Sequence, residues 1–374
     1  MHKLIVFGCI FSWLTLRLPL LAHQQLRELM AVEHRGDSTH MVDIVTGDWR
    51  FLKSHPRWEF VNLFVIGEFH HVKSNHRVEN SLYFYLASEV GMSDIIVEEG
   101  LATTFLLNRY ITTGDNRLLE QYMTYPHSIQ YYRSLRKLIV TKNIKPPTLH
   151  SVDLEDSPQN ILLYIDHNTS SHHRVIRNLV PSFNKWREDK LDTRIISDAS
   201  AVVLLKTMFA EYMQDSTYFD TSVRQVFHTA IVLFDEYELM RSTDFNTCND
   251  TAMINLRERI MFAKMKPYLN DNFKALVILG SIHIPYENQK SNYLFRCPYE
   301  WKSVMSQLID GRHISRDRVL SFQIVFPNKK LEQHFDALGF SYSSAKGALK
   351  RSNFIVQVLT AMNNAPFDFL IITR

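Results

Sequence analysis

Three runs of apolar residues along the chain end abruptly in polar side chains. The runs cover residues 61–66, 95–97 and 275–279 and are rich in β-branched residues, which predicts buried strands. They end in Gly67-Glu68-Phe69-His70-His71, in Glu98-Glu99-Gly100 and in Gly280-Ser281-Ile282-His283, respectively. Ligands of α/β sheets bind beyond the carboxyl ends of the strands, so these polar groups are candidates for a site.

A helical pattern separates the first two of these strands. Apolar residues recur at spacings of three and four from residue 78 to residue 90, and the pattern stops near Gly91. A strand, a helix and a strand joined by short connections are typical of a parallel pair. Further strands are expected at 148–153, 320–326 and 367–372, and helices at 101–142 and after Asn249. The pattern predicts an α/β fold with a central, mostly parallel sheet flanked by helices.

Residues 158–245 have a helical pattern and lack glycine, which predicts a long helical insertion. This insertion is expected either to cap the site or to form a further helical layer. No linker rich in Pro, Gly or Ser divides the chain. We therefore expect one α/β domain over residues 23–374 that contains the insertion.

The first 22 residues differ from the rest of the chain. A short basic start is followed by an apolar segment over residues 4–16 and by a small residue, Ala22, at a plausible cleavage point. A membrane-spanning helix needs about 20 apolar residues, and Arg17 interrupts this run. We expect a cleaved export signal and a periplasmic or extracellular protein without a membrane span, with an uncleaved anchor or a buried helix as alternatives. After cleavage only Cys248 and Cys297 remain, and the sequence leaves open whether they pair.

Composition and charge exclude several classes of protein. The chain has 374 residues, 45% of them hydrophobic and 22% charged, which is typical of a globular protein rather than a disordered one or a repeat array. The net charge of +3 is too balanced for a nucleic-acid-binding surface, and no basic run is interleaved with aromatic residues. A small molecule is the expected partner.

The sequence after the first strand carries the most specific candidate chemistry. Glu68 and His71 stand in a Glu-x-x-His relation, and Glu68 and His70 in a Glu-x-His relation. A carboxylate that accepts one ring N–H of histidine raises the basicity of the other nitrogen, which can then take a proton from water. Adjacent side chains of an extended segment point to opposite sides. We therefore expect one of the two histidines to face the site and the other to pack inward.

Other strand ends add acids and a second histidine. Glu98 and Glu99 follow the second strand, and we expect one of them to enter the site. His283 follows the third of the buried strands, beyond a glycine that permits close approach of the backbone. Asp153 ends the strand expected at 148–153, Glu155 follows it, and both are weaker candidates. Histidines and carboxylates together also leave metal binding open.

At this point the motifs resemble a known family. Gly67-Glu68-x-x-His71, then a helix to Gly91, then Val97-Glu98-x-Gly100, resembles the erythromycin-esterase-like group, which is related to Tiki-type proteases and to haem-uptake lipoproteins of the ChaN kind. Further similar features are His150-Ser151-Val152-Asp153, Asn249-Asp250-x-x-Met253-x-Asn255, the strand into His283 and Phe367-Asp368-Phe369-Leu370-Ile371. The Glu-x-His spacing of His70 is similar to that of the haem-uptake branch, and Cys248 stands where the family tends to carry arginine.

The resemblance implies an α/β fold with a helical addition and a role for each matching residue. His71 would be the base that activates water, Glu68 and Glu98 the acids around it, and His283 a second imidazole that stabilises the transition state. His70, Glu99, Asp153 and Glu155 would serve in binding. Esterases of this group work without a metal, whereas the Tiki branch uses one.

We therefore expect an exported hydrolase that cleaves an ester or a lactone and needs no cofactor. Two alternatives stay open at this stage. The same pocket could bind haem or a divalent metal through His70, His71 and His283, or the domain could be a catalytically silent scaffold or toxin-type module.

Overall fold

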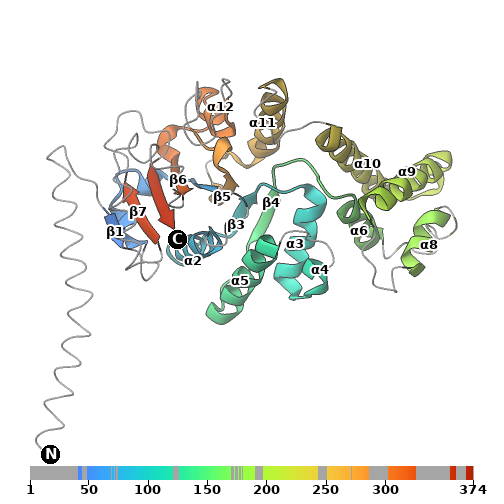
Figure 1. Ribbon diagram of the computed structural model, residues 1–374, viewed down its shortest axis with the longest axis horizontal. Helices are drawn as coiled ribbons and strands as arrows, with labels where there is room; N and C mark the ends of the chain where they lie inside the picture. The colour runs from blue at the N-terminus through green and yellow to red at the C-terminus, as the bar shows by residue number, and fades with distance from the viewer. Residues whose placement is uncertain are drawn as a thin grey trace, which may run out of the picture.

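A sheet of eight strands organises the part of the chain that the computed structural model describes (Figure 1). The described residues are 41–43, 49–68, 70, 72, 75–120, 126–169, 172, 176, 178, 180–189, 197–242, 251–270, 272–285, 302–325, 354–358 and 368–373. From one edge to the other, the strands are β1 (Met41–Asp43), β7 (Phe354–Val358), β8 (Phe369–Thr373), β6 (Val319–Val325), β2 (Leu63–Glu68), β5 (Ala275–Gly280), β3 (Asp94–Val97) and β4 (Thr148–Ser151).

The direction of the strands confirms the predicted sheet. The strands from β8 to β4 in this order all run parallel to their neighbours, whereas β7 runs antiparallel to both β1 and β8. The strand predicted at 148–153 ends at Ser151, and the one predicted at 367–372 is observed from Phe369 to Thr373. The sheet is therefore mostly parallel, and the fold is α/β.

Helices cover both faces of the sheet. On one face lie α2 (Asn75–Val90), α3 (Leu101–Thr113), α4 (Arg117–Glu120) and α5 (Pro126–Lys142), and on the other lie α11 (Thr251–Met265) and α12 (Val304–Asp310). Alternate strand residues divide between the two faces, as a pleated strand requires. Phe64 and Ile66 pack on the α2 side, whereas Leu63 and Val65 pack on the α11 side. Apolar residues at every position of β2 thus follow from burial on both faces.

The connections diverge at the centre of the sheet. β5 lies between β2 and β3, so the connection from β2 through α2 runs to one side. The connection from β5 through α12 to β6 runs to the other side, over the opposite face of the sheet. Such a reversal of strand order opens a crevice at the carboxyl ends of the strands involved. The fold therefore places its natural binding crevice where β2 and β5 end.

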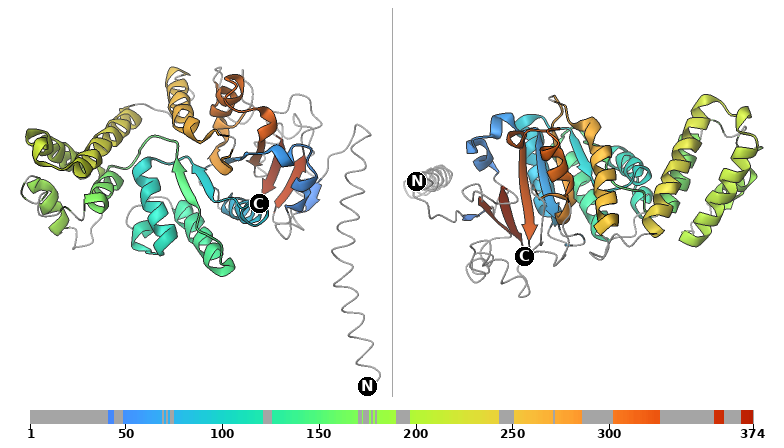
Figure 2. Two further views of the ribbon diagram at one scale, coloured as in Figure 1. Left: turned by 180° about the vertical axis from the view of Figure 1, so that it is seen from behind. Right: turned by 90° about the horizontal axis from the view of Figure 1, so that it is seen from above.

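Four helices form a separate apolar cluster beyond the β4 edge of the sheet (Figures 1 and 2). They are α6 (Pro158–Thr169), α8 (Pro181–Asp189), α9 (Asp198–Gln214) and α10 (Thr221–Ser242). Ser197 caps α9 by accepting a hydrogen bond from the backbone of Ser200. Ala102 of α3 joins the cluster and connects it to the sheet layer. These helices occupy the stretch predicted as a helical insertion and lie beside the sheet rather than over its faces.

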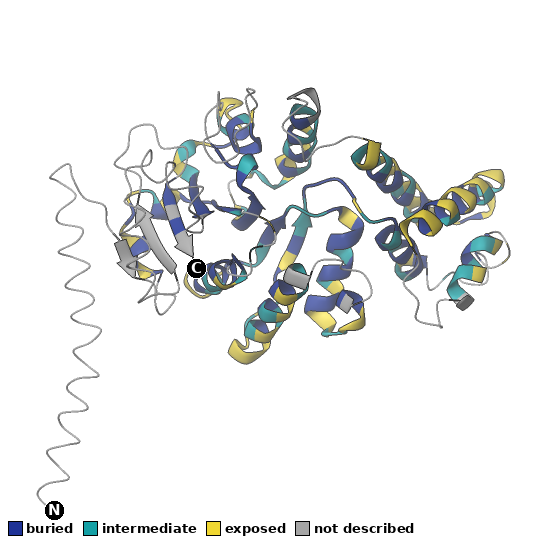
Figure 3. Cartoon of the chain, in the orientation of Figure 1, coloured by how far each residue is buried: buried dark blue, intermediate teal, exposed yellow. Residues whose placement is uncertain are grey.

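Burial follows this arrangement. The strands and the inner sides of the flanking helices are buried, whereas exposed residues gather on the outer sides of helices such as α5 and α9 (Figure 3). Among the described residues, no helix is both long enough and apolar enough to cross a membrane. The predicted export signal at residues 1–22 and both Cys248 and Cys297 lie outside the described residues.

Asp368 ties the amino ends of β6 and β8 together. Its carboxylate accepts hydrogen bonds from Arg57, from Arg316 at 2.6 Å and from the backbone N–H of Ser321 at 2.9 Å. Burial raises the pKa of Asp368, but Arg316 and Arg57 outweigh burial and hold that pKa below its ordinary value. Asp368 is 2% exposed, so this cluster keeps a buried charge matched at the end of the sheet opposite the crevice.

Replacing Asp368 by Asn should therefore destabilise the fold. The change leaves two guanidinium groups beside a neutral amide, and breaking a buried ion pair costs about 3 kcal/mol. Chemical denaturation followed by circular dichroism measures the free energy of unfolding. Asp317→Asn, an exposed acid two residues before β6, is the matched control and should change that free energy by less than about 0.5 kcal/mol. Equal stability of the two variants would contradict this account of Asp368.

Candidate functional site

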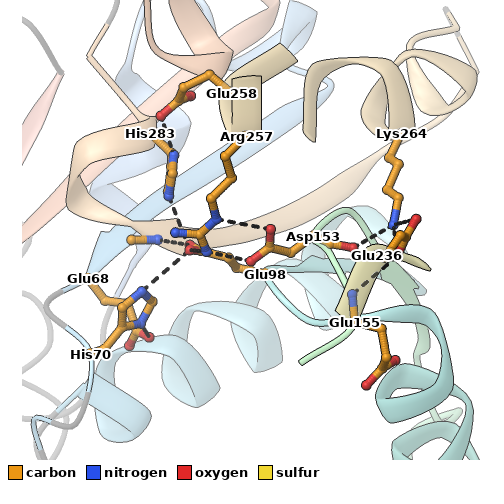
Figure 4. A network of polar contacts seen from close by, with 11 residues as sticks. Glu68, His70, Glu98, Asp153, Glu155, Glu236, Arg257, Glu258, Lys264 and His283 are labelled. Atoms are coloured by element: carbon orange, nitrogen blue, oxygen red, sulfur yellow. Dashed lines mark hydrogen bonds and ion pairs between the residues drawn. The ribbon is translucent and has the colours of Figure 1, made fainter. Parts of the chain in front are cut away.

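Polar residues from four neighbouring strands converge at the carboxyl edge of the sheet (Figure 4). Glu68 is the last residue of β2, Glu98 follows β3, and Asp153 follows β4. His283 closes the single 3₁₀ turn η8 (Ser281–His283) directly after β5. Because β2, β5, β3 and β4 are adjacent and parallel, their ends deliver these side chains to one place.

His70 pairs with the carboxylate at the end of its own strand. Its Nδ1 lies 3.1 Å from Oε1 of Glu68, and its Nε2 lies 3.5 Å from Oε1 of Glu98. Asn75, the first residue of α2, donates to the other oxygen of Glu68 at 2.8 Å. The side chain of His70 is 48% exposed, compared with 20% for Glu68 and 5% for Glu98. His70 is thus positioned by two carboxylates and remains accessible to a ligand.

Glu98 is the centre of the cluster. Its Oε1 accepts hydrogen bonds from Arg257 at 2.7 Å and from Nε2 of His283 at 3.1 Å. Its Oε2 accepts the backbone N–H of Gly280. The side chain of Glu98 is only 5% exposed, so these donors replace water around a buried carboxylate.

Two residues of α11 complete the cluster. Arg257 bridges Glu98 and Asp153, with its Nε 3.1 Å from Oδ1 of Asp153. Glu258 lies 2.5 Å from Nδ1 of His283. Each ring nitrogen of His283 therefore faces a carboxylate oxygen, an arrangement that suits the doubly protonated imidazolium.

These contacts shift the pKa values of the cluster in consistent directions. Burial raises the pKa of Glu98, but His283, His70 and Arg257 outweigh burial and hold it well below its ordinary value. Burial lowers the pKa of His283, but Glu258 and Glu98 outweigh burial and raise it to about 9. Desolvation also lowers the pKa of His70, but Glu98 and Glu68 raise it well above its ordinary value. At neutral pH the cluster therefore holds an ionised Glu98 between cations.

A second carboxyl group lies behind Glu68. Glu79 of α2 is hydrogen-bonded to Glu68, and burial together with the charge of Glu68 raises the pKa of Glu79 well above its ordinary value. Burial also raises the pKa of Glu68, but hydrogen bonds with His70 and Glu79 outweigh burial and hold that pKa below its ordinary value. The two carboxyl groups therefore share one proton, which Glu79 keeps.

The glycine of the β5 turn is required by close packing. A Cβ atom on Gly280 would lie 2.8 Å from Nε2 of His70 and 3.2 Å from Oε2 of Glu98. Real Cβ atoms do not approach other atoms to the first of these distances, so a side chain here would displace His70. The prediction that this glycine permits close approach is confirmed, and the groups that approach are those of the site.

The structure brings some of the site residues predicted from the sequence into contact and leaves others apart. Glu68, His70, Glu98, Asp153 and His283 join one network (Figure 4). His71 lies outside the described residues, so its assignment as the base stays a prediction.

Glu155 joins the network only through its backbone N–H, which donates to Glu236 at 3.2 Å (Figure 4), and Glu99 lies at the margin of the network. The carboxylate of Glu155 accepts the backbone N–H groups of Ala102 and Thr103, so it caps the start of α3 instead. This role satisfies the free N–H groups of a helix start. Burial raises the pKa of Glu155 to about 7. Glu99 lines the cavity beside His70. Burial is the main cause that raises the pKa of Glu99 well above its ordinary value, and the nearby acids raise it further.

Sequence reasoning missed Arg257, Glu258 and Glu79. All three lie within helices, where a charged residue is ordinarily placed on the solvent side. The resemblance did raise the question of an arginine, because Cys248 stands where the family tends to carry one. In this chain Arg257 brings a guanidinium group to the site. No pattern in the sequence distinguished Arg257 from a charged residue that faces solvent.

A cavity of about 110 Å³ opens beside His70. It lies between the ends of β2 and β3, the start of α2 and the start of α5. Its lining includes Glu68, His70, Asn75, Glu79, Glu98, Glu99, Tyr131 and Tyr132. No residue of α6 to α10 lines it, so the described part of the insertion does not cap this cavity.

The described residues do not fit a metal ion in this cluster. Among them, no group of three or more His, Cys, Asp or Glu side chains is arranged to hold one. The guanidinium group of Arg257 occupies the place between Glu98 and Asp153, and its positive charge opposes a second cation there.

Comparison with known proteins shows the fold. No family model and no curated protein matches the sequence. The chain is similar to a solved structure of a mutant of the erythromycin esterase EreC in its open conformation, with a TM-score of 0.53 and 14% identity over 90% of this chain and 97% of that one. It is also similar to a protein of Bacillus cereus, with a TM-score of 0.52 and 14% identity over 94% of this chain and 97% of that one. The chain thus has the fold of an erythromycin esterase, as its motifs indicated.

Proposed function

We propose that the protein hydrolyses an ester or lactone with a water molecule activated by His70 and Glu68. The observation that carries the proposal is the half-exposed imidazole of His70, which lines a cavity and has Nδ1 3.1 Å from Glu68 and Nε2 3.5 Å from Glu98. The fold shared with an erythromycin esterase supports the reaction class.

The residues account for both proton transfers of such a reaction. The reacting form of His70 is the one that has lost its proton, which the raised pKa of His70 makes the minor form at neutral pH. Held at Nδ1 by Glu68, it takes a proton from water at Nε2 while the water oxygen attacks the ester carbonyl. The tetrahedral intermediate then breaks its bond to the leaving oxygen, which takes the proton back from Nε2 of His70. The products are a carboxylic acid and an alcohol, and no covalent intermediate with the protein is needed.

Glu98 contributes to this chemistry by electrostatics. Its negative charge, 3.5 Å from Nε2 of His70, stabilises the imidazolium that forms when His70 takes the proton. Arg257 and His283 keep Glu98 ionised and fixed in position. A buried and pre-oriented charge of this kind acts without the reorganisation that water would need.

His70→Ala should reduce turnover of a panel of esters and lactones by roughly 10²- to 10⁴-fold, the usual contribution of a positioned base. The protein should stay folded, because His70 is half exposed and contributes little to the core. Steady-state kinetics together with circular dichroism measures both properties.

His71→Ala belongs in the same experiment, because the sequence alone favoured that histidine. His172→Ala, a change on the helical insertion where His172 contacts Ser222 and Asp220, is the control. Full turnover in His70→Ala together with loss in His71→Ala would move the role of base to His71. Turnover that neither change affects would contradict the proposal.

The stability of the protein should depend on pH through His283. Its pKa rises from 6.5 in the unfolded chain to about 9 in the fold. The stabilisation is therefore complete below pH 6.5 and is lost as the pH rises toward 9. In this window the folded protein holds one proton that the unfolded chain has lost, so the free energy of unfolding falls by up to about 1.4 kcal/mol for each unit by which the pH rises. Urea denaturation at several pH values measures this free energy of unfolding.

His283→Gln isolates this contribution. The difference in unfolding free energy between the natural protein and this variant should shrink as the pH rises from 6.5 to 9. A difference that stays constant over this range would show that His283 is not held as an imidazolium.

A further inference from the structure

An ion pair between two helices lies beside the site and has no part in the proton transfers described above (Figure 4). Nζ of Lys264, from α11, lies 2.7 Å from Oε1 of Glu236, from α10 of the helical insertion. Neither of these two described residues lines the cavity beside His70. Their side chains are 24% and 17% exposed, which is less than in an ordinary surface ion pair. The other contacts of the pair therefore indicate its role.

The pair holds the backbone after β4 on both sides of Leu154. Lys264 donates to the carbonyl oxygen of Asp153 at 2.6 Å, and Oε2 of Glu236 accepts the backbone N–H of Glu155 at 3.2 Å. All three residues of this segment are buried. Buried backbone groups are nearly always paired, and here the two charged side chains supply the partners. The position of the segment therefore depends on the ion pair.

Asp153 connects this segment to the centre of the site. Its Oδ1 accepts a hydrogen bond from Nε of Arg257 at 3.1 Å, and Arg257 donates to Oε1 of Glu98 at 2.7 Å. The same oxygen of Glu98 lies 3.5 Å from Nε2 of His70. A continuous chain of contacts thus runs from the ion pair to the proposed base.

One face of α11 provides both cations of this chain. Arg257 and Lys264 are seven residues apart, or about two turns, so both side chains point from α11 toward the segment after β4. The carboxylate of Asp153 is held by the first cation and its carbonyl group by the second. Losing Lys264 frees that peptide group to rotate, and its rotation moves the carboxylate that Arg257 binds.

We propose that Lys264 and Glu236 are positioning residues for the carboxylate beside the proposed base. They hold Asp153, which holds Arg257, and Arg257 holds Glu98. The inference rests on the proposed hydrolysis and deepens it, because it makes the rate of turnover depend on a residue of the helical insertion. Since neither residue lines the cavity, the pair acts on the chemical step and leaves substrate binding unchanged.

Glu236→Leu removes both contacts of this carboxylate. It should lower kcat by roughly tenfold and keep KM within about twofold, because a small displacement of a reacting or stabilising group slows the chemical step. Steady-state kinetics with the best substrate of the ester and lactone panel measures both constants, and circular dichroism checks the fold. Glu238→Leu is the matched control. It makes the same change two residues further along α10, where Glu238 pairs with Lys206 at the surface, and should leave kcat unchanged.

Two further variants separate position from charge. Oε2 of Glu236 accepts from both Lys264 and the backbone of Glu155, and the amide oxygen in Glu236→Gln can do the same. This variant should therefore keep kcat within about threefold of the natural value. Lys264→Met should lower kcat as Glu236→Leu does. The double variant should be no slower than either single one, because both changes break the same junction.

A measurement without substrate tests the coupling itself. The imidazoles of His70 and His283 both face Oε1 of Glu98, so their ring resonances report its position in the full chain. Both resonances should move in Glu236→Leu and stay in place in Glu238→Leu. A residue that only stabilised the insertion would leave them in place in the folded protein. NMR spectra recorded at one pH measure these positions.

Several outcomes would overturn the proposal. They are resonances that Glu236→Leu leaves in place, a change in KM alone, an equal effect of Glu238→Leu, and effects of the two single changes that multiply in the double variant. If Glu236→Leu failed to fold, Lys264→Met would carry the same tests. Moved resonances in a protein that hydrolyses no ester would keep the coupling and refute the proposed function alone. Hydrolysis that neither change slows would refute only the role of the pair.

Discussion

The ionised carboxylate of Glu98, almost fully withdrawn from water, is the constraint on which the site depends. A buried carboxylate is unfavourable unless charges and hydrogen-bond donors surround it. Arg257, His283 and the backbone of Gly280 supply these donors, and each comes from a different element. His70 then faces the same carboxylate from the open side. The geometry of the proposed base is thus a consequence of how the protein satisfies one buried charge.

The order of the strands makes this convergence possible. β5 lies between β2 and β3, so the glycine that ends β5 and the histidine that follows it fall between the acids at the ends of the two neighbouring strands. The crossovers from β2 and β5 leave toward opposite sides, which keeps a crevice open at their ends. At the other end of the sheet, Asp368 and its two arginines hold β6 and β8 together. The ion pairs that stabilise the sheet and the residues of the site therefore lie at opposite ends of the strands.

Much of the fold could be predicted from the sequence, because buried parallel strands are apolar at every position and end in recognisable turns. For the same reason Glu68, Glu98 and His283 stood out. Arg257 and Glu258 did not, since a charged pair within a helix has the same pattern whether it faces water or a buried partner. Glu155 illustrates the reverse case. An acid after a strand has the pattern of a site residue, yet here it caps α3, and only the packing of β4 beside that helix, where Asn108 is hydrogen-bonded to Leu149, brings it there.

NMR titration of the histidine side chains tests the central claim most directly, because it measures the charge coupling around Glu98 in the full chain. His70→Gln and His283→Gln assign the two resonances. The account predicts that both imidazoles titrate well above the ordinary pKa of 6.5 and that both values fall in Glu98→Gln. Ordinary pKa values for the two histidines, or values that Glu98→Gln leaves unchanged, would contradict it.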